Sequence, residues 1–392
     1  MINHNFDVVI LGDGPVGQIL ALLLAKISQN PQLIALIKNP LSKSKFSFKS
    51  KSIIDDSRVL ALNYGSLALL ESLNIELKYF CEIKHIHISQ YNKFGRCIIN
   101  SEDFGLSNLG NVVTYNHLCS ILEKSIAKCG VTILNQSSEK YFTQQNIDAF
   151  YVKLKDLNIS SRIGIKCDGT ISDGMNTLKN NQYALVTIIK ADLPCNYYAW
   201  ERFTSNGPLA LLPFPQRQGV YSVIWCGTFD NIKYLHELDR KHFSEILNKT
   251  FGYRLGRFEC EENKQMIPLI SNVCQNLVLD RLVIIGNSAQ ILHPVAGQGL
   301  NLGFRDAGCL SECLKDWFRN VESNPLPLLQ SFKQSRNLDR KLTINITNFL
   351  PYIFSTKLFP IEYACGMALM MLDLIPSLRK IFLKHFLVGF RY

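Results

Sequence analysis

Apolar and polar positions near the N-terminus predict one strand–turn–helix–strand unit. Residues 7–11 form a mostly apolar run that stops at Gly12, which is the pattern of a buried parallel strand. Residues 18–27 are rich in Ala and Leu and predict a helix, and residues 33–37 form a second short apolar run. Strand, glycine-rich turn, helix and strand follow one another within about 30 residues, the length of one β-α-β unit.

Two later segments repeat the pattern of an apolar strand that runs into a glycine. Residues 162–167 lead into Asp168-Gly169, and residues 282–285 lead into Gly286-Asn287. Such strands are typical of a parallel sheet whose loops carry the polar groups. They extend the predicted sheet beyond the first unit.

The remaining patterns predict antiparallel strands and then helices. Residues 183–228 alternate between apolar and polar positions around Gly and Pro, which indicates antiparallel strands. From Leu342 onward the pattern is helical, with expected interruptions at Pro351, Pro360 and Pro376. The fold class predicted is therefore α/β of a mixed α+β kind.

Composition limits the class of protein. The chain has 392 residues, 47% of them hydrophobic and 19% charged, which is enough apolar material for a core. No run reaches the roughly 18 apolar residues of a membrane span. The 12 cysteines are scattered without a Cys-x-x-Cys pair, so we expect reduced thiols, a cytoplasmic protein and no metal site. The net charge of +10 suits an anionic partner: a nucleic acid, a membrane surface or a cofactor.

The first glycine-rich turn, Gly12-Asp-Gly14-Pro-Val-Gly17, fits the dinucleotide pattern G-x-G-x-x-G between a strand and a helix. Gly12 permits the tight turn, Gly14 allows a pyrophosphate to approach the backbone, and Gly17 allows the helix to pack on the strand. The helix start then offers free N–H groups to phosphates. The acid expected at the end of the second strand is absent, because Lys38 stands there.

The second glycine-rich segment runs from Gly286 to Asp306 and is the most informative part of the chain. It predicts a strand end, a loop, and a Gly-Gln-Gly turn that opens a helix reaching about Leu314. Free N–H groups at 297–302 suit an anion or an electron-rich ring edge.

This segment resembles the signature of the group A FAD-dependent aromatic monooxygenases, and among them the ubiquinone-biosynthesis hydroxylases. The variant Gly-Asn-x-Ala-Gln…His-Pro is most similar to the 2-polyprenyl-6-methoxyphenol hydroxylase branch. The matching residues are Gly286, Asn287, Ala289, Pro294, Ala296, Gly297, Gln298, Gly299, Asn301, Leu302, Gly303 and Asp306.

Further blocks extend the resemblance over nearly the whole chain. They are the D-x-R-x-x-A-L segment with Asp56 and Arg58, the D-G-x-x-S motif with Asp168, Gly169 and Ser172, and the substrate-domain segments 201–204 and 207–213. The resemblance implies that Arg58 lies near the flavin and that Asp168-Gly169 serves FAD and reduced pyridine nucleotide. Met175 stands where the family often has Arg.

The resemblance implies a Rossmann-like FAD-binding domain of the para-hydroxybenzoate hydroxylase type, with an inserted antiparallel β-sheet substrate domain and C-terminal helices. The expected bounds are 1–75, 108–180 and 272–345 for the FAD-binding domain, 76–107 and 181–271 for the substrate domain, and 346–392 for the helical region.

The implied activity is FAD-dependent hydroxylation of a polyprenylated phenol ring, with NAD(P)H and O2, through a flavin C4a-hydroperoxide. The expected catalytic residues are His293, Pro294 and Arg58. The expected cofactor contacts are Gly12, Gly14, Gly17, Arg58, Asp168, Gly169, Gly286, Asn287, Gly297, Gln298, Gly299, Asn301 and Leu302.

Two of these roles have structural alternatives. His293 either tunes the flavin, accepts a substrate proton or is purely structural, since an ordinary histidine titrates near pH 6.5. Arg58 contacts the flavin or the nucleotide, or else forms a salt bridge with Asp55 or Asp56. Arg336 and Asp339 are expected to form a structural ion pair or a cap.

Other functions stay open at this stage. One is a related flavoprotein acting on another lipid, as an epoxidase or reductase. Another is a degenerate flavin-binding scaffold of a ubiquinone-biosynthesis complex, suggested by Lys38 and Met175. A nucleic-acid binder is least favoured, because no basic and aromatic module is visible.

The basic charge is then divided among three places: attraction for FAD and NAD(P)H phosphates, a basic loop at 43–51, and the basic, apolar tail 378–392. The tail suits an anionic membrane surface or a partner, or packs on its own domain. A cytoplasmic protein, in peripheral contact with the inner face of the membrane, is the expected location. The sequence leaves the oligomeric state open.

Overall fold

The computed structural model describes residues 2–38, 58–135, 141–146, 148–154, 157–170, 176–356 and 358–388. The basic loop expected at 43–51 lies outside the described residues, as do Asp55, Asp56, Ser172 and Met175.

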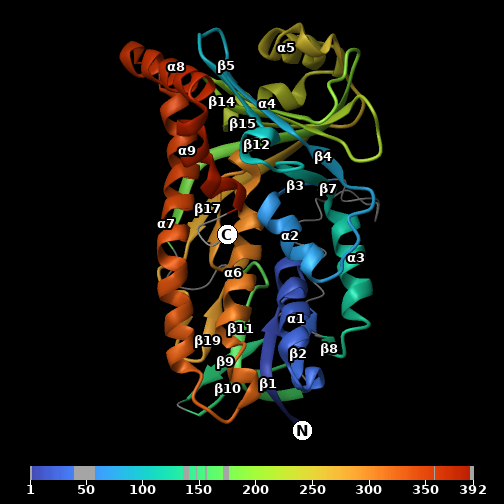
Figure 1. The fold of residues 1–392 in the computed structure, drawn as a ribbon. Coiled ribbons are helices and arrows are strands. Elements are labelled where there is room, and N and C mark those ends of the chain that lie inside the picture. Colours follow the sequence, from blue (N-terminus) through green and yellow to red (C-terminus); the bar gives the residue numbers. More distant parts are fainter. Residues whose placement is uncertain are drawn as a thin grey trace.

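The lower half of the molecule in Figure 1 is built on an eight-stranded sheet. Helix α1 (Pro15–Ile27) connects the parallel strands β1 and β2, so the predicted β-α-β unit is confirmed. The strands of the main path are β18 (Val278–Leu279), β19 (Leu282–Ile284), β11 (Leu157–Lys166), β1 (Ile2–Leu11), β2 (Ile34–Lys38) and β8 (Thr132–Asn135), with β10 (Phe150–Lys153) pairing with β11 and β9 (Phe142–Gln145) pairing with β10.

A small antiparallel sheet lies between the two large sheets. It has the order β3-β7-β4, and helices α2 and α3 follow two of its strands directly. The elements are β3 (Val59–Asn63), α2 (Tyr64–Ser72), β4 (Cys81–Ile83), β7 (Gly110–Thr114) and α3 (Tyr115–Ile126).

The upper half contains a nine-stranded sheet, which confirms the antiparallel strands predicted within 183–228. Its pairs are antiparallel except β13 with β5, which are parallel. Its strands are β20 (Gln290–Ile291), β17 (Gln265–Val273), β12 (Asn176–Ala191), β15 (Val220–Thr228), β14 (Gly207–Pro213), β13 (Tyr198–Thr204), β5 (His85–Gln90), β6 (Arg96–Asn100) and β16 (Phe258–Cys260), the last pairing with β12.

One face of this sheet is covered by α4 (Phe229–Glu237) and α5 (Arg240–Phe251), over a core that includes Trp200, Trp225 and Phe243. Strands from 85–100 and from 176–273 share the sheet. Strand β20 also joins it, although residues 290–291 fall in the expected FAD-binding segment. The exact division of the chain into domains stays a prediction.

Four helices complete the chain, and the mixed α/β class is confirmed. They are α6 (Gln298–Leu314), α7 (Leu326–Ser355), α8 (Phe359–Leu374) and α9 (Pro376–Val388). Figure 1 shows α7 running alongside both halves of the molecule. Helices α8 and α9 begin at or beside Pro360 and Pro376, as predicted.

The predicted interruption at Pro351 is wrong, because α7 continues through it to Ser355. Proline inside a helix removes one i→i−4 hydrogen bond and crowds the preceding turn. Pro351 lies in the last turns of a 30-residue helix, so the loss is confined to one end. The packing of the preceding turns outweighs it.

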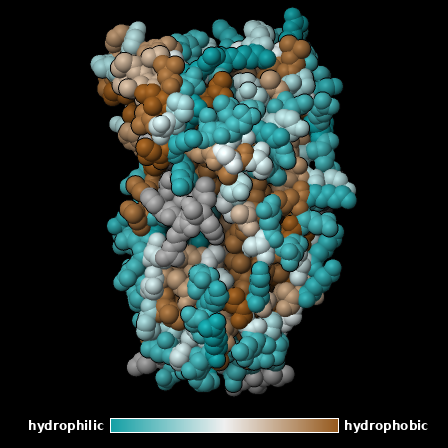
Figure 2. Space-filling view, in the orientation of Figure 1, coloured by the Kyte–Doolittle hydropathy of each residue, from teal (hydrophilic) through white to brown (hydrophobic). Residues whose placement is uncertain are grey.

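The C-terminal helices expose many large apolar side chains. Helix α8 is apolar on all sides, yet only Cys365, Gly366 and Leu369 are buried. Figure 2 shows apolar residues gathered over this end of the molecule, at the upper left. Among the described residues, no helix is long and apolar enough to cross a membrane. The exposed side chains are Leu358, Phe359, Tyr363, Met367, Met370, Met371, Leu374, Ile375, Leu378 and Ile381.

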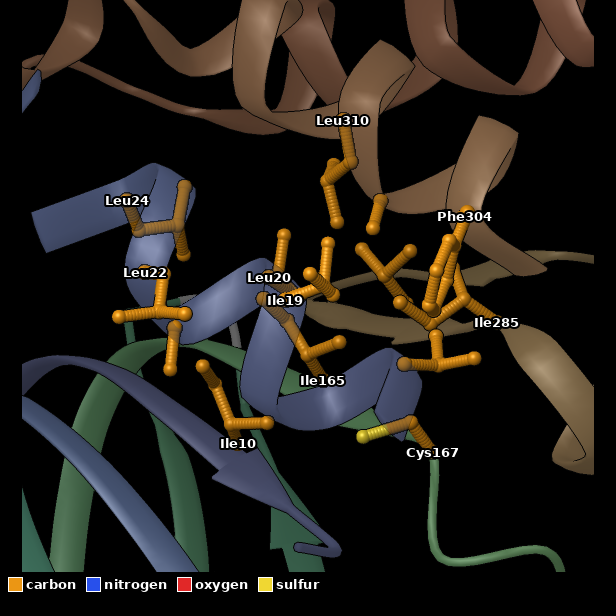
Figure 3. Packing of buried hydrophobic residues seen from close by; sticks show 14 of the residues in the cluster. Ile10, Ile19, Leu20, Leu22, Leu24, Ile165, Cys167, Ile285, Phe304 and Leu310 are labelled. Atoms are coloured by element: carbon orange, nitrogen blue, oxygen red, sulfur yellow. The ribbon is translucent and has the colours of Figure 1, made fainter. Parts of the chain in front are cut away.

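The main core joins α1 to both the lower sheet and α6. Figure 3 shows Ile19 and Leu20 of α1 among side chains from β11 and α6, including Ile165 and Leu310. Phe304 of α6 is fully buried in the same cluster. This packing fixes the start of α1 relative to the start of α6, the two glycine-rich turns that the sequence singles out.

Candidate functional site

The first glycine-rich turn is held by its own packing. Gly12 has φ +120°, donates its N–H to the Ile37 carbonyl at 3.2 Å, and would place a Cβ 2.6 Å from the Asp168 backbone. A Cβ on Gly17 would lie 2.0 Å from the Gly12 carbonyl oxygen. These two glycines are therefore required by the turn itself, whether or not a ligand binds.

Gly14 differs from both, since nothing in the described protein lies within 4 Å of a Cβ built on it. Its φ of −69° suits any residue. It is the N-cap of α1, and no side chain caps that helix start. Free N–H groups at an uncapped helix start form an anion site. The open side of Gly14 therefore fits the approach of a phosphate to the backbone.

The end of β11 and the loop after β19 meet at Asp168. Its Oδ1 accepts hydrogen bonds from the Ser288 hydroxyl at 3.0 Å and from the N–H and hydroxyl of Thr170. Its Oδ2 accepts one from the Tyr141 hydroxyl at 2.6 Å. The Gly169 N–H donates to the Ser288 hydroxyl at 2.9 Å. The Asp168 carboxylate thus ties together loops about 120 residues apart along the chain.

Asn287 lies at the tip of this junction and is exposed. Its neighbour Gly286 has φ +61° and rests on Val16 of α1, where a Cβ would lie 3.2 Å from the Val16 side chain. A Cβ on Gly303 would lie 2.7 Å from the same side chain. Val16 therefore brings the predicted flavin loops against the start of α1.

The second glycine-rich turn passes from Pro294 to α6. The Gly297 N–H donates to the Pro294 carbonyl at 3.0 Å, and Gly297 has φ +59°. A Cβ on Gly297 would lie 3.3 Å from Cβ of Ala61 in β3. Gly299, in the first turn of α6, has nothing within 4 Å of such a Cβ. Gly14 and Gly299 thus both leave open space that a bound group can fill.

The side-chain amide of Asn301 makes its hydrogen bonds within the protein. Its Oδ1 accepts from the Ser66 hydroxyl at 2.7 Å and the Asn63 N–H at 3.0 Å, and its Nδ2 donates to the carbonyls of Ala61 at 2.9 Å and Gly297 at 2.8 Å. Leu302 is fully buried, and Gln298 accepts a hydrogen bond from Arg305. Side chains at these three predicted contact positions face the protein, which leaves the backbone of the turn for a cofactor.

A buried charge network holds α6 on α7. Arg336 forms an ion pair with Asp306 at 2.7 Å and another with Asp339, while Arg305 pairs with Asp339 at 2.6 Å. Arg340 donates to the Gln290 side chain at 2.7 Å. The structural ion pair expected for Arg336 and Asp339 is confirmed. Arg305, Arg340 and Gln290 were not anticipated, because their partners are far away in the sequence.

His293 is buried next to the turn. Its Nδ1 accepts from the Val295 N–H at 3.4 Å, and no described residue hydrogen-bonds its Nε2. Burial lowers the pKa of His293 to about 4. The imidazole is therefore neutral at physiological pH and a weak proton acceptor. Its predicted role in catalysis stays a prediction.

Arg58 directly precedes β3, three residues before Ala61. Its carbonyl accepts from the Tyr115 N–H at 2.8 Å, and its guanidinium lies 5.0 Å from the centre of the Tyr115 ring. Strand β3 connects Arg58 to Ala61, which lies against Gly297. Lys38 is the last residue of β2, at the edge of the sheet where the dinucleotide-type turn lies.

The arrangement fits FAD, a long molecule with a pyrophosphate in its middle, adenosine on one side of the pyrophosphate and the flavin ring at the far end of the other side. The open glycines at the starts of α1 and α6 supply two places for backbone approach, and the Asp168 junction adjoins the first glycine-rich turn, since a Cβ on Gly12 would lie 2.6 Å from the Asp168 backbone. Among the described residues, no group of three or more acids, His or Cys is placed to hold a metal ion.

The family and the relatives that match this chain are named for FAD binding and for hydroxylation of ubiquinone or a related quinol. The FAD binding domain family matches residues 5–337. The chain is 28% identical over 251 residues to ubiquinone hydroxylase UbiL of Rhodospirillum rubrum, covering 62% of this chain and 58% of that protein. It is 23% identical over 401 residues to 3-demethoxyubiquinol 3-hydroxylase of Escherichia coli, covering 98% and 99%.

Solved structures agree in fold. The p-nitrophenol 4-monooxygenase PnpA from Pseudomonas putida has a TM-score of 0.75 at 13% identity, with 99% of this chain and 100% of that chain covered. The flavin-dependent brominase Bmp2 has a TM-score of 0.69 at 13% identity, covering 98% and 94%. At such identities the likeness establishes the fold alone.

Proposed function

The chain belongs to the FAD binding domain family, and on this premise we propose that it is an FAD-dependent monooxygenase that hydroxylates a polyprenylated phenol in ubiquinone biosynthesis. NAD(P)H and O2 are the co-substrates. The observation that carries the proposal is the pair of open glycines, Gly14 and Gly299, at the starts of two helices held together by Val16. The ubiquinone hydroxylases among the relatives support the substrate class.

Different parts of the chain would bind different parts of FAD. The uncapped start of α1 would receive the pyrophosphate. The exposed Asn287 lies against Gly169, its Cβ 3.8 Å from a Cβ built on that glycine. The backbone N–H groups at the start of α6 would interact with the flavin ring, because the positive end of the helix dipole favours negative charge. When bound, FAD supplies hydride acceptance from NAD(P)H and activation of O2.

The protein must also keep the turn rigid. Asn301 fixes the turn to β3, and the Arg336 network fixes α6 to α7. Rigid donors stabilise a developing charge without reorganising, which is the usual source of large electrostatic effects in enzymes. His293 adds a neutral, buried wall next to Pro294.

Peripheral contact with a membrane is the second part of the proposal. The apolar side chains of α8 and α9 lie beside exposed Lys380 and Lys384. The two acids of α8 face the protein, since Glu362 pairs with Lys93 and Asp373 accepts from the Ile98 N–H. An apolar surface with only basic charge suits an anionic lipid surface, where a polyprenyl substrate resides.

The test is reconstitution. The purified chain is expected to bind FAD and show a flavin spectrum, and its NAD(P)H oxidation is expected to rise when a short-chain 2-prenyl-6-methoxyphenol is added. Failure to bind flavin would contradict the enzyme proposals. Flavin binding without stimulation by the phenol would favour the alternatives: action on another lipid as an epoxidase or reductase, or a flavin-binding scaffold of a biosynthetic complex.

A further inference from the structure

Glu201 lies in the middle of β13, on the face of the sheet that α4 and α5 do not cover. Side chains alternate along a strand, so the neighbouring Trp200 points to α5 and contacts Phe251 at 5.7 Å between ring centres. The register places Glu201 beside Ala210 of β14 and Ile88 of β5. The side chain therefore emerges in the centre of the sheet, facing α7.

The surroundings of Glu201 are apolar. On the same face of β13 lie Ala199 and Phe203, and Phe203 stacks on Phe354 of α7 with ring centres 4.0 Å apart. Among the described residues, Glu201 has no hydrogen bond and no ion pair. Glu201 is only partly buried, but its apolar surroundings and the lack of a partner still disfavour the charged carboxylate, and perturbed carboxyls of this kind cluster at functional sites.

Few other titratable groups share this face. Cys226 of β15 does, and both burial and the charge of Glu201 raise the pKa of its thiol. Arg202, Arg254 and His87 lie on the opposite face, where Arg254 bonds to His87 at 2.7 Å. No cation among the described residues therefore offsets the charge of Glu201. Burial alone raises the pKa of Glu201 to about 7.

Two elements connect Glu201 to the predicted flavin turn. Strand β3 places Val59 in an apolar cluster with Ala199 and places Ala61 against Gly297. Helix α7 packs both on the segment 295–297 and on β13. The Glu201 face and the Gly297 turn therefore border the same part of the interior, where a substrate ring must lie to meet a flavin.

Among the groups near this place, Glu201 suits proton transfer best. A general base works most effectively when its pKa lies near the working pH. His293, with a pKa of about 4, is too weak a base, and the Cys226 thiol is too weak an acid to be ionised. Glu201 alone is ionised in part at neutral pH.

We propose that Glu201 is the catalytic residue that accepts the ring-hydroxyl proton of the phenolic substrate. This inference rests on the proposed function. The phenol O–H bond breaks as an O–H bond forms on Glu201, and the electron pair stays on the phenolate oxygen and enriches the ring. After one oxygen atom from O2 has been added to a ring carbon, the displaced ring proton passes to water. Glu201 then returns its proton to the phenolate oxygen. The two electrons come from NAD(P)H, and the second oxygen atom leaves as water.

The test compares the FAD-reconstituted full chain with its Glu201→Gln variant, in which size and hydrogen bonding are kept and the base is removed. In the wild type we expect kcat to rise with pH through an apparent pKa near 7. In the variant we expect this rise to disappear and kcat to fall about 100- to 1,000-fold, with KM little changed. Glu201→Asp is expected to restore part of the pH dependence.

Binding gives a readout that does not depend on turnover. Quenching of flavin fluorescence measures the affinity for the phenol and for its O-methyl ether, which has no proton to donate. The wild type is expected to bind the phenol more tightly above pH 7 than below, and the ether equally at both. Glu201→Gln is expected to bind both ligands without pH dependence. Glu259→Gln, at an exposed position of β16, is the matched control and is expected to resemble the wild type.

This inference would be overturned if Glu201→Gln kept the wild-type kcat, pH profile and phenol binding while the phenol still stimulated the enzyme. The proposed function would then remain intact. Absence of phenol stimulation in the wild type would overturn the proposed function and this inference together.

Discussion

The side-chain oxygen of Asn301 accepts a hydrogen bond from the hydroxyl of Ser66 at 2.7 Å, although the two residues are 235 positions apart. Both side chains are almost fully buried, at 1% and 2% exposure. This bond and the one to the Ala61 carbonyl attach the start of α6 to β3 and α2. The turn that faces the predicted flavin therefore depends on a partner from the first fifth of the chain.

We expect Asn301→Leu to destabilise the apoprotein by on the order of 3 kcal/mol, because it removes the hydrogen bonds that the Asn301 side chain makes to Ser66, Asn63, Ala61 and Gly297 in the interior. Ser66→Ala removes one bond and is expected to cost about 1 kcal/mol. Denaturant unfolding of the apoprotein measures both. Equal midpoints for Asn301→Leu and the wild type would contradict the assigned role.

Alanine at Gly14 or Gly299 tests the two open glycines. The backbone at both positions tolerates a side chain, and a Cβ meets no protein atom within 4 Å, so the apoprotein is expected to remain folded. FAD affinity is expected to fall at least about tenfold, since the methyl group occupies the path of the cofactor. Gly308→Ala on α6 is the matched control, because its Cβ only reaches ordinary contact with Leu69 at 3.6 Å. Titration of the apoprotein with FAD measures all three, and unaltered affinity at both open positions would oppose the proposed cofactor path.

His293 is expected to make the fold sensitive to acid. Its pKa falls from 6.5 to about 4 on folding because of burial, so the unfolded chain binds the proton more readily than the folded one. The stability contributed by the neutral ring is present above pH 6.5 and is lost as the pH falls toward 4, by up to about 3 kcal/mol. His293→Gln is expected to remove this part of the acid sensitivity. The test is the unfolding free energy of the wild type and of His293→Gln, measured at several pH values between 4 and 6.5. If the two free energies fall by the same amount as the pH is lowered, His293 does not titrate as described.

Glu201 is expected to have the opposite effect on the pH dependence of stability, since it lowers stability as the pH rises. Its pKa rises from 4.5 to about 7 on folding, so the folded chain binds the proton more readily than the unfolded one. The stability contributed by the protonated carboxyl is present below pH 4.5 and is lost as the pH rises through 7, by up to about 3 kcal/mol. Glu201→Gln is therefore expected to be more stable than the wild type at pH 8, with the difference vanishing in acid. Thermal unfolding at several pH values tests this, and a variant less stable than the wild type at pH 8 would contradict it.

The apolar surface of α8 and α9 predicts lipid binding. Replacing Leu374 and Ile381, which are 69% and 78% exposed, by Ser is expected to weaken binding to vesicles with anionic lipid at least about tenfold. Leu193→Ser is the control, because Leu193 is 64% exposed but lies in the loop after β12, where its N–H donates to the Leu255 carbonyl. Sedimentation with vesicles measures the effect. Equal sedimentation of the double variant and the control would assign the surface to another partner.

The sequence predicted the elements that depend on local pattern. The first strand, helix and second strand appear where expected, because a buried parallel strand and an Ala/Leu-rich helix are visible over a few residues. The helix after the second glycine-rich turn ends at Leu314, also as expected. The fold class followed from these units and from the family resemblance.

What the sequence could not predict depends on contacts between distant residues. The signature that includes Asn301 suggested a cofactor contact, whereas its side chain proves to be committed to Ala61, Asn63 and Ser66. The hydrogen bond from Tyr141 to Asp168 had no sequence signal at all. Glu201 lies in a segment that the family resemblance includes, but only the strand register and the side-chain contacts show that its carboxyl makes no hydrogen bond or ion pair among the described residues.

Helix α7 gives the molecule a mechanical property. Its 30 residues span about 45 Å, and it touches the Gly297 turn region, the Glu201 strand and α8. Because α7 is attached at these three places, the orientation of α8 and α9 fixes the orientation of both halves of the protein. If α8 and α9 lie on a flat surface, α7 therefore sets the tilt of the protein relative to that surface. On the proposed function, the interior around Glu201 and the Gly297 turn would then be held at a fixed height and angle above the lipid layer that contains the proposed polyprenyl substrate.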